Sequence, residues 1–316
     1  MPYPHQDTTI NEYHGYWLPD ISLIYKPFTW STIRLAYTNT LSYPDFTQIT
    51  PLIVIGSTGN ITWHNFALKP VRSQNYDIAF SIYNNSIGMF TASGFLKQID
   101  GLVFNTGTRY PKYPDAYGQF TGVPTNLSKS VPYSISYSIN DPYRTNVWGA
   151  EAEWQAHFWY FPYPLDGLVL NVNYTHIFSG AKYPFTYNYQ TVKYPQIIVT
   201  YVDTFYTDRL YQQPNDIVNL SLGFDFKGFS ILASMIYQSD VFNTNNFWPE
   251  LRGIKQKYLR WDISAKQDLP WHNLQLFMDI NNLNNENDSY IIQGPGYNST
   301  IQNYGMSADL GIRWQL

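Results

Sequence analysis

Three side chains that could do chemistry stand at alternate positions of one segment. Glu151, Glu153 and His157 alternate with the small or apolar residues of GAEAEWQAHF. In a β-strand they would point to one face. Two carboxylates and an imidazole on one face are groups used in acid–base catalysis and metal binding. Asp77 and Asp225 hold similar positions elsewhere. The alternative is a hydrated wall without chemistry, and we favour it over a reactive site.

Other catalytic and metal-binding patterns are missing from the sequence. The absence of Cys excludes disulfides, thiolate metal sites and a Cys nucleophile. There is no Gly-x-Ser-x-Gly elbow, and Gly294–Gly296 is predicted to be a turn. The remaining histidines form no His-x-x-x-His pair: His5, His14, His64, His176 and His272. We therefore predict no catalytic residue, no metal site and no cofactor.

The segment 182–211 is unusually rich in tyrosine. Exposed aromatic rings in adaptable loops are well suited to binding a sugar, a haem-like molecule or a peptide. The alternative is that the rings pack against neighbouring loops and anchor an interface. We predict an outer loop that binds ligand through seven tyrosines: Tyr183, Tyr187, Tyr189, Tyr194, Tyr201, Tyr206 and Tyr211.

Alternation of apolar and polar residues runs through the whole chain. At the C-terminus, apolar residues stand at every second position from Ala308 to Leu316. Similar stripes occupy 218–226, 229–237, 259–265 and 274–280. Including weaker examples upstream, we predict eleven strands. Such segments of about ten residues, with aromatic ends, are typical of transmembrane β-barrels.

Composition supports the same class. Charged residues are 13% of the 316 residues and aromatic residues 18%. No run of about 18 apolar residues exists, so no transmembrane helix is encoded. The net charge of −4 argues against nucleic acid as a partner. The N-terminus, MPYPHQDTTI, lacks the regions of a signal peptide. We expect either a mature chain or the C-terminal part of a longer protein.

The connections between predicted strands alternate strictly between short and long. Aromatic residues such as Trp30, Trp159 and Trp271 flank the short ones. Tight turns on one side and long loops on the other are expected of an outer-membrane barrel, with aromatic rings at the headgroup level. We expect the long loops to be irregular and the strands to span about ten to fifteen residues.

Several stretches together resemble the barrel of TonB-dependent outer-membrane receptors of the kind found in Bacteroidetes. They include WLPDISLIYKPFTWSTIRLAYTNTLSYPDF at residues 17–46 and LKPVRSQNYDIAF at 68–80. Further similarity lies in GAEAEWQAHFWYFPYPLDG at 149–167 and LFMDINNLNNEND at 276–288. Tyr43, where the family often has Arg, and the terminal Leu316, where it usually has Phe, depart from the pattern.

The resemblance implies that residues 1–316 are the C-terminal half of a receptor barrel. Such transporters have about 22 strands, so eleven would form an all-β, antiparallel, up-and-down, open half-barrel. The plug domain and signal peptide are expected to be absent from this chain. Implied partners are outer-membrane lipid, the receptor's own plug, the TonB system and an unknown solute. The implied function is active uptake of a scarce solute across the bacterial outer membrane.

Two other functions stay open at the level of sequence. One is a complete small outer-membrane barrel enzyme, of the lipase or protease type, with catalytic residues at its rim. The other is a passive porin or adhesin. The transporter is favoured because the resemblance extends over essentially the whole chain, whereas no hydrolase motif is present.

Overall fold

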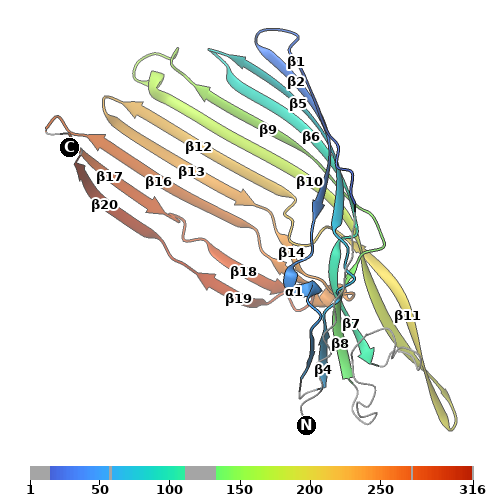
Figure 1. Ribbon diagram of the computed structural model, residues 1–316. Coiled ribbons are helices and arrows are strands. Elements are labelled where there is room, and N and C mark those ends of the chain that lie inside the picture. Colours follow the sequence, from blue (N-terminus) through green and yellow to red (C-terminus); the bar gives the residue numbers. More distant parts are fainter. Residues whose placement is uncertain (1–14, 57–58, 111–132, 272, 315–316) are drawn as a thin grey trace.

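A computed structural model describes residues 15–56, 59–110, 133–271 and 273–314. In these ranges eleven antiparallel strands follow one another as neighbours in a single large sheet (Figure 1). We call these eleven strands the wall. They are β1 (Asp20–Tyr25), β2 (Ser31–Ser42), β5 (Val71–Asn84), β6 (Gly88–Asp100), β9 (Thr145–His157), β10 (Leu168–Lys193), β12 (Asp216–Phe226), β13 (Phe229–Gln238), β16 (Tyr258–Asp268), β17 (Leu274–Asn281) and β20 (Ser307–Trp314).

Alternation along each strand gives the wall two chemically different faces, because cross-strand partners lie on the same face. One row of successive partners is apolar or aromatic: Ile33, Phe80, Ala92, Ala152 and Tyr174. The adjacent row points to the other face and is more polar: Arg34, Ala79, Ser93, Glu151 and Thr175. The predicted all-β antiparallel class with eleven strands is confirmed.

Short connections join the wall strands at one end, which we call the short-turn end. The connection between β12 and β13 is a two-residue turn in which Lys227 and Gly228 have φ of 48° and 78°. Two left-handed residues make a type I′ turn, whose twist matches that of the flanking strands. The link between β9 and β10 contains the short helix η2 (Leu165–Gly167).

The opposite end, which we call the far end, carries the long connections. The expectation that these are irregular loops is wrong, because much of their length forms further strands. β10 has 26 residues, well beyond the predicted length, and its outer part pairs with β11 (Gln196–Asp208). Val, Ile, Thr and Tyr have high strand propensity, so the pairing continues past the wall.

Within the described residues, two small sheets and two short helices complete the far end. One sheet has the order β3 (Ile53–Ile55), β4 (Asn60–Trp63), β8 (Tyr133–Asn140) and β7 (Val103–Tyr110). The other has the order β14 (Val241–Thr244), β15 (Gly253–Lys255), β18 (Asn287–Ile292) and β19 (Asn298–Asn303). The helix α1 (Phe46–Ile49) precedes β3, and η3 (Pro249–Leu251) precedes β15.

The wall is open. Within the described residues β1 pairs only with β2, and β20 pairs only with β17 (Figure 1). Residues of both edge strands are largely exposed, as expected for an open half-barrel. Since eleven neighbours alternate in direction, β1 and β20 run in the same direction along the wall.

Buried side chains are few in the described residues, and the hydrophobic clusters lie at the far end. One cluster is built on Ile61, Trp63 and Ile135 of the first small sheet, and another on Ala181, Tyr183 and Phe242. None of the helices in the described ranges is long and apolar enough to cross a membrane.

Candidate functional site

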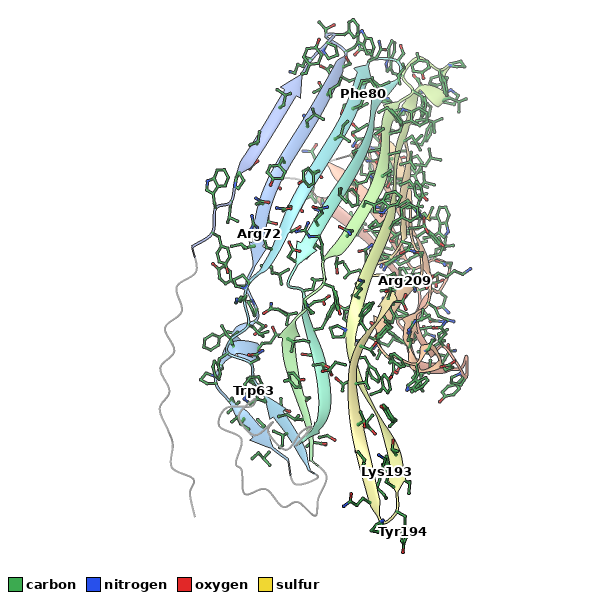
Figure 2. The ribbon with its side chains drawn as sticks, turned by 90° about the vertical axis from the view of Figure 1, so that its right-hand side faces the viewer. Trp63, Arg72, Phe80, Lys193, Tyr194 and Arg209 are labelled. Carbon is green, nitrogen blue, oxygen red and sulfur yellow. The ribbon has the colours of Figure 1, made fainter. Side chains whose placement is uncertain are left out.

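A two-stranded ribbon projects from the far end. We define the ribbon as the paired parts of β10 and β11, from Ala181 opposite Asp208 to Lys193 opposite Gln196. Figure 2 shows it extending beyond the wall, with Lys193 and Tyr194 at its tip. The ribbon carries most of the tyrosines that the sequence predicts to bind ligand.

The base of the ribbon buries one of these tyrosines, Tyr183, and partly buries another, Tyr206. Tyr183 is 1% exposed and stacks on Tyr206, with ring centroids 5.1 Å apart. The Tyr183 hydroxyl donates to the carbonyl of Arg209 at 2.9 Å and accepts from the amide of Tyr211 at 2.8 Å. Burial raises the pKa of Tyr183 far above its ordinary value, and that of Tyr206 to about 12. Both phenols therefore stay neutral and serve packing.

Two arginines fix the base from neighbouring segments. Arg252 donates to Asp208 at 2.5 Å, and its guanidinium lies 4.7 Å from the centre of the Tyr206 ring. Arg209 pairs with the carboxylate of Asp240 and donates to its carbonyl at 3.0 Å. The sequence does not predict these pairs, because nothing in the local pattern brings residues 208 and 252 together.

The other predicted tyrosines are more exposed. Tyr194 is 96% exposed, whereas Tyr187, Tyr189 and Tyr211 are 40%, 50% and 39% exposed. The backbone of Tyr201 lies on β11, but its side chain is outside the described residues. The seven tyrosines are therefore not gathered in one site. Those at the base hold the ribbon, and those along it present aromatic surface.

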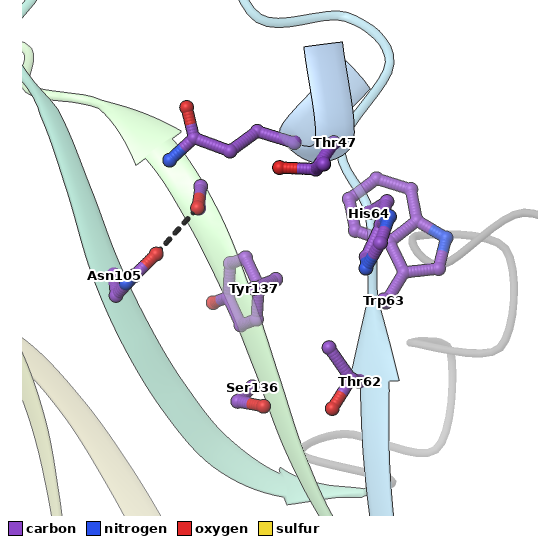
Figure 3. Close-up of a pocket in the computed structure, with 9 residues that line it drawn as sticks. Thr47, Thr62, Trp63, His64, Asn105, Ser136 and Tyr137 are labelled. Carbon is purple, nitrogen blue, oxygen red and sulfur yellow. Dashed lines mark hydrogen bonds between the residues drawn. The ribbon is translucent and has the colours of Figure 1, made fainter. Parts of the chain in front are cut away.

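A pocket of about 310 Å³ lies at the far end, between α1, the end of β4 and the strands β7 and β8 (Figure 3). It is lined by Thr47, Gln48, Thr62, Trp63, His64, Asn105, Ser136, Tyr137 and Ser138. The sequence pattern does not predict this pocket. The strands β4 and β8 pair in parallel across a long stretch of chain, with Thr62 opposite Ser136. Alternation of apolar and polar residues along a strand does not indicate which distant strand it pairs with.

The pocket walls are held by contacts of their own. The Ser138 hydroxyl donates to the Asn105 side-chain oxygen at 2.5 Å (Figure 3). Asp45 and Gln48 form a capping box at the start of α1, in which the Gln48 oxygen accepts from the Asp45 amide at 3.1 Å. Nδ1 of His64 is buried and makes no hydrogen bond within the described residues.

A buried carboxyl group lies where β8 returns to the wall. Asp141 is 3% exposed, accepts from the amide of Tyr143 at 3.0 Å, and leaves Oδ2 without a partner among the described residues. Burial raises its pKa to about 6, although the Tyr143 hydrogen bond and the charge of Lys182 oppose the shift. Burial therefore keeps this carboxyl protonated to a higher pH than an exposed aspartate.

Glu151, Glu153 and His157 lie on one strand, β9, as predicted, but they do not share a common partner among the described residues. Glu151 accepts from the hydroxyls of Ser93 at 3.4 Å and Thr175 at 3.5 Å. His157 lies 3.1 Å from the backbone oxygen of Asp166 instead of a carboxylate. The described ranges contain no group of three or more His, Cys, Asp or Glu residues placed to hold a metal ion. Asp77 and Asp225 lie on other wall strands.

An open antiparallel wall with one apolar face and long strand extensions at one end is the architecture of part of an outer-membrane barrel. Residues 3–283 match the family described as "TonB dependent receptor-like, beta-barrel". The chain belongs to this family, whose members are bacterial outer-membrane proteins of transport rather than enzymes.

Solved structures agree on the fold. The ferric enterobactin receptor of Pseudomonas aeruginosa is 13% identical, with a TM-score of 0.61 over 94% of this chain and 40% of that one. The FrpB iron transporter of Neisseria meningitidis is 15% identical, with a TM-score of 0.53 over 93% of this chain and 38% of that one. The chain thus spans about two-fifths of these proteins. No curated protein matches it.

Proposed function

We propose that this chain is part of an outer-membrane receptor that takes up a scarce solute actively, with energy supplied through the TonB system. The observation that carries the proposal is the two-faced open wall of a TonB-dependent receptor barrel with strand extensions at one end only. The apolar face would meet lipid and the polar face would line the interior. The far end would then face the outside of the cell.

The finer assignment follows the sequence resemblance. We propose that the chain is the C-terminal half of a receptor of the Bacteroidetes type, and that a plug domain elsewhere in the receptor fills the interior. In this arrangement the charged side chains of the polar face, such as Glu151 and Asp225, contact water and the plug. Lipid and the TonB system are the further partners.

The direction of the two edge strands supports the presence of further strands that complete the barrel. Unpaired strand edges do not survive in hydrocarbon, where each unsatisfied backbone group costs several kcal/mol. Because β1 and β20 run in the same direction, joining them directly would make a parallel pair in an otherwise antiparallel wall. An odd number of additional strands restores antiparallel pairing at both edges. Eleven more would give the total of about 22 known for such transporters.

Solute recognition is proposed at the far end. The exposed tyrosines Tyr187, Tyr189, Tyr194 and Tyr211 offer aromatic surface there. The solved relatives carry names that refer to ferric enterobactin and iron. At 13–15% identity they support the fold of this chain, and an iron chelate is one solute class to be tested.

The test is uptake by cells that carry the complete receptor gene. A mixture of solutes at low concentration is supplied, and depletion from the medium is followed by mass spectrometry. The matched controls are a receptor deletion and a TonB deletion. We expect at least one solute whose uptake is lost in both deletions. Receptor-dependent uptake that persists without TonB would instead indicate a passive porin, and the absence of any receptor-dependent uptake would contradict transport.

A further inference from the structure

We propose that the pocket between α1, β4, β7 and β8 binds a neutral, polyhydroxylated ligand of the size of one sugar ring. The inference deepens the proposed function, on which it rests, by naming a class of solute. Its first support is size. At about 310 Å³ the pocket lies at the lower end of small-molecule sites. It suits a single ring better than a large chelate.

The second support is the absence of formal charge in the lining. None of the nine lining residues is Lys, Arg, Asp or Glu. The nearby carboxylate of Asp45 is occupied, since it accepts from the amide and the hydroxyl of Thr47 at 2.8 Å each. A charged ligand would lose hydration here without meeting an opposite charge, which is costly. A neutral ligand avoids this cost.

The third support is the set of polar groups that line the pocket. Within the described residues, no hydrogen bond occupies the amide nitrogens of Gln48 and Asn105, or the hydroxyl of Thr62. Nδ1 of His64 also makes none. Amides, hydroxyls and an imidazole together offer donors and acceptors to the hydroxyl groups of a ligand. Their convergence on a small space matches a ligand with several hydroxyls.

The fourth support is a rigid apolar portion of the lining. Trp63 is 8% exposed and packs edge-on against Tyr137, with ring centroids 6.4 Å apart. Both residues belong to the hydrophobic cluster of this small sheet, which also contains Ile61 and Ile135. Sugar rings present C–H groups beside their hydroxyls, so an apolar portion next to polar groups fits them. Prior packing reduces the entropy lost on binding.

The experiment measures binding to the complete receptor, purified in detergent, by titration calorimetry. The probes are glucose, galactose, mannose and their β-methyl glycosides, with glucuronate and galacturonate as charged counterparts. Each of two variants removes one hydrogen-bonding function from the pocket: Thr62→Val removes the hydroxyl, and Asn105→Asp removes the amide donor but keeps an acceptor for Ser138. Matched controls make the same changes on β19, at exposed positions outside the pocket: Thr300→Val and Asn298→Asp.

We expect saturable binding of at least one neutral probe, tighter than its uronate counterpart. Each pocket variant should weaken that binding about threefold to tenfold, the value of one neutral hydrogen bond, whereas the β19 controls should not change it. The inference is overturned if no neutral probe binds saturably, if the uronates bind more tightly, or if both pocket variants bind as the unaltered receptor does.

Failure of this inference is distinguishable from failure of the transport proposal. If TonB-dependent uptake of another solute is observed while the sugars do not bind, only the ligand class is wrong. If a neutral sugar binds in the pocket and receptor-dependent uptake is independent of TonB, the pocket stands and the energised transport proposal fails.

Discussion

The side chain of a single tyrosine, Tyr183, connects the segments at the base of the ribbon. The Tyr183 hydroxyl bridges the carbonyl of Arg209 and the amide of Tyr211, and the ring contacts Tyr206, Phe242 and Phe104. The tyrosine was predicted from sequence as a ligand contact, because its residue type and loop position are those of a binding residue. Tyr183 serves packing instead, because it is buried, and the residues that bury it come from segments far away in the sequence.

Replacing Tyr183 by Phe should destabilise the far end without changing its packing. The substitution leaves the Tyr211 amide and the Arg209 carbonyl without their partner in a buried place, at a cost of about 1–3 kcal/mol. The check is the free energy of unfolding of the complete receptor in urea with lipid vesicles. Tyr189→Phe, at an exposed position, is the control and should stay within about 0.5 kcal/mol. Equal effects of the two changes would contradict the structural role of Tyr183.

Asp141 should make stability depend on pH. Its pKa in the folded protein is about 6, above the ordinary value of 3.8. The unfolded chain therefore loses this proton first as pH rises, and stability falls between about pH 4 and pH 6. Asp141→Asn removes the titration. We expect the variant to match the unaltered protein at pH 4 and to be more stable at pH 8, by about 1–3 kcal/mol.

The measurement is the urea midpoint of both proteins across this pH range. A variant that loses stability at pH 8 would show that the ionised carboxylate of Asp141 is favourable in the fold, and the assigned direction would be wrong.

Among elements, the wall strands are packed tightly at certain glycines. Gly149 on β9 lies opposite Phe95 on β6, and a Cβ added to it would come within 2.7 Å of the Phe95 ring and 2.4 Å of the His176 carbonyl. Gly311 on β20 likewise lies opposite Phe277 on β17, and a Cβ added to it would come within 2.5 Å of the Phe277 ring. Aromatic rings that cover cross-strand glycines help to fix the register of a sheet.

Gly149→Ala should weaken the wall, since a backbone carbonyl cannot move aside as a flexible side chain can. We expect a loss of about 1–3 kcal/mol and less folded receptor in the outer membrane. Gly180→Ala on β10 is the matched control, because an added Cβ there meets nothing within 4 Å. The amount of heat-resistant folded protein on gels measures both. A normal yield of the Gly149 variant would contradict the close contact.

Sequence patterns predicted the wall elements well, and the far end poorly. The stripes of β12, β13, β16 and β17 are regular, because each strand faces two different environments throughout its length. The composition of the tyrosine-rich segment predicts an irregular loop, since Asn, Pro and Thr are common in loops. Its ribbon forms because tyrosine and β-branched residues favour strands once a partner strand is beside them.

The pocket could not be predicted for a different reason. Its lining comes from α1, β4, β7 and β8, and the parallel pairing of β4 with β8 depends on a long intervening stretch of chain. Residues such as Thr62 and Asn105 are ordinary in isolation. They become a candidate site only when the chain brings them together.

At the scale of the whole molecule, the edge strands β1 and β20 each have one side that pairs with no strand within the described residues. We expect the chain produced alone to give no heat-resistant barrel in lipid vesicles, because its edges expose unpaired backbone groups. Production together with the rest of the receptor should restore a heat-resistant form. A closed, heat-stable barrel formed by this chain alone would contradict the proposal that further strands complete the barrel.

The central claim is that the apolar face of the wall meets lipid while the polar face lines the interior. Because the chain has no Cys, single Cys residues can be placed from Val218 to Leu222 of β12 and spin-labelled in the complete receptor in outer-membrane vesicles. We predict high oxygen accessibility at residues 218, 220 and 222, and lower oxygen accessibility at 219 and 221. Accessibility without this period of two, or with the opposite phase, would contradict the account.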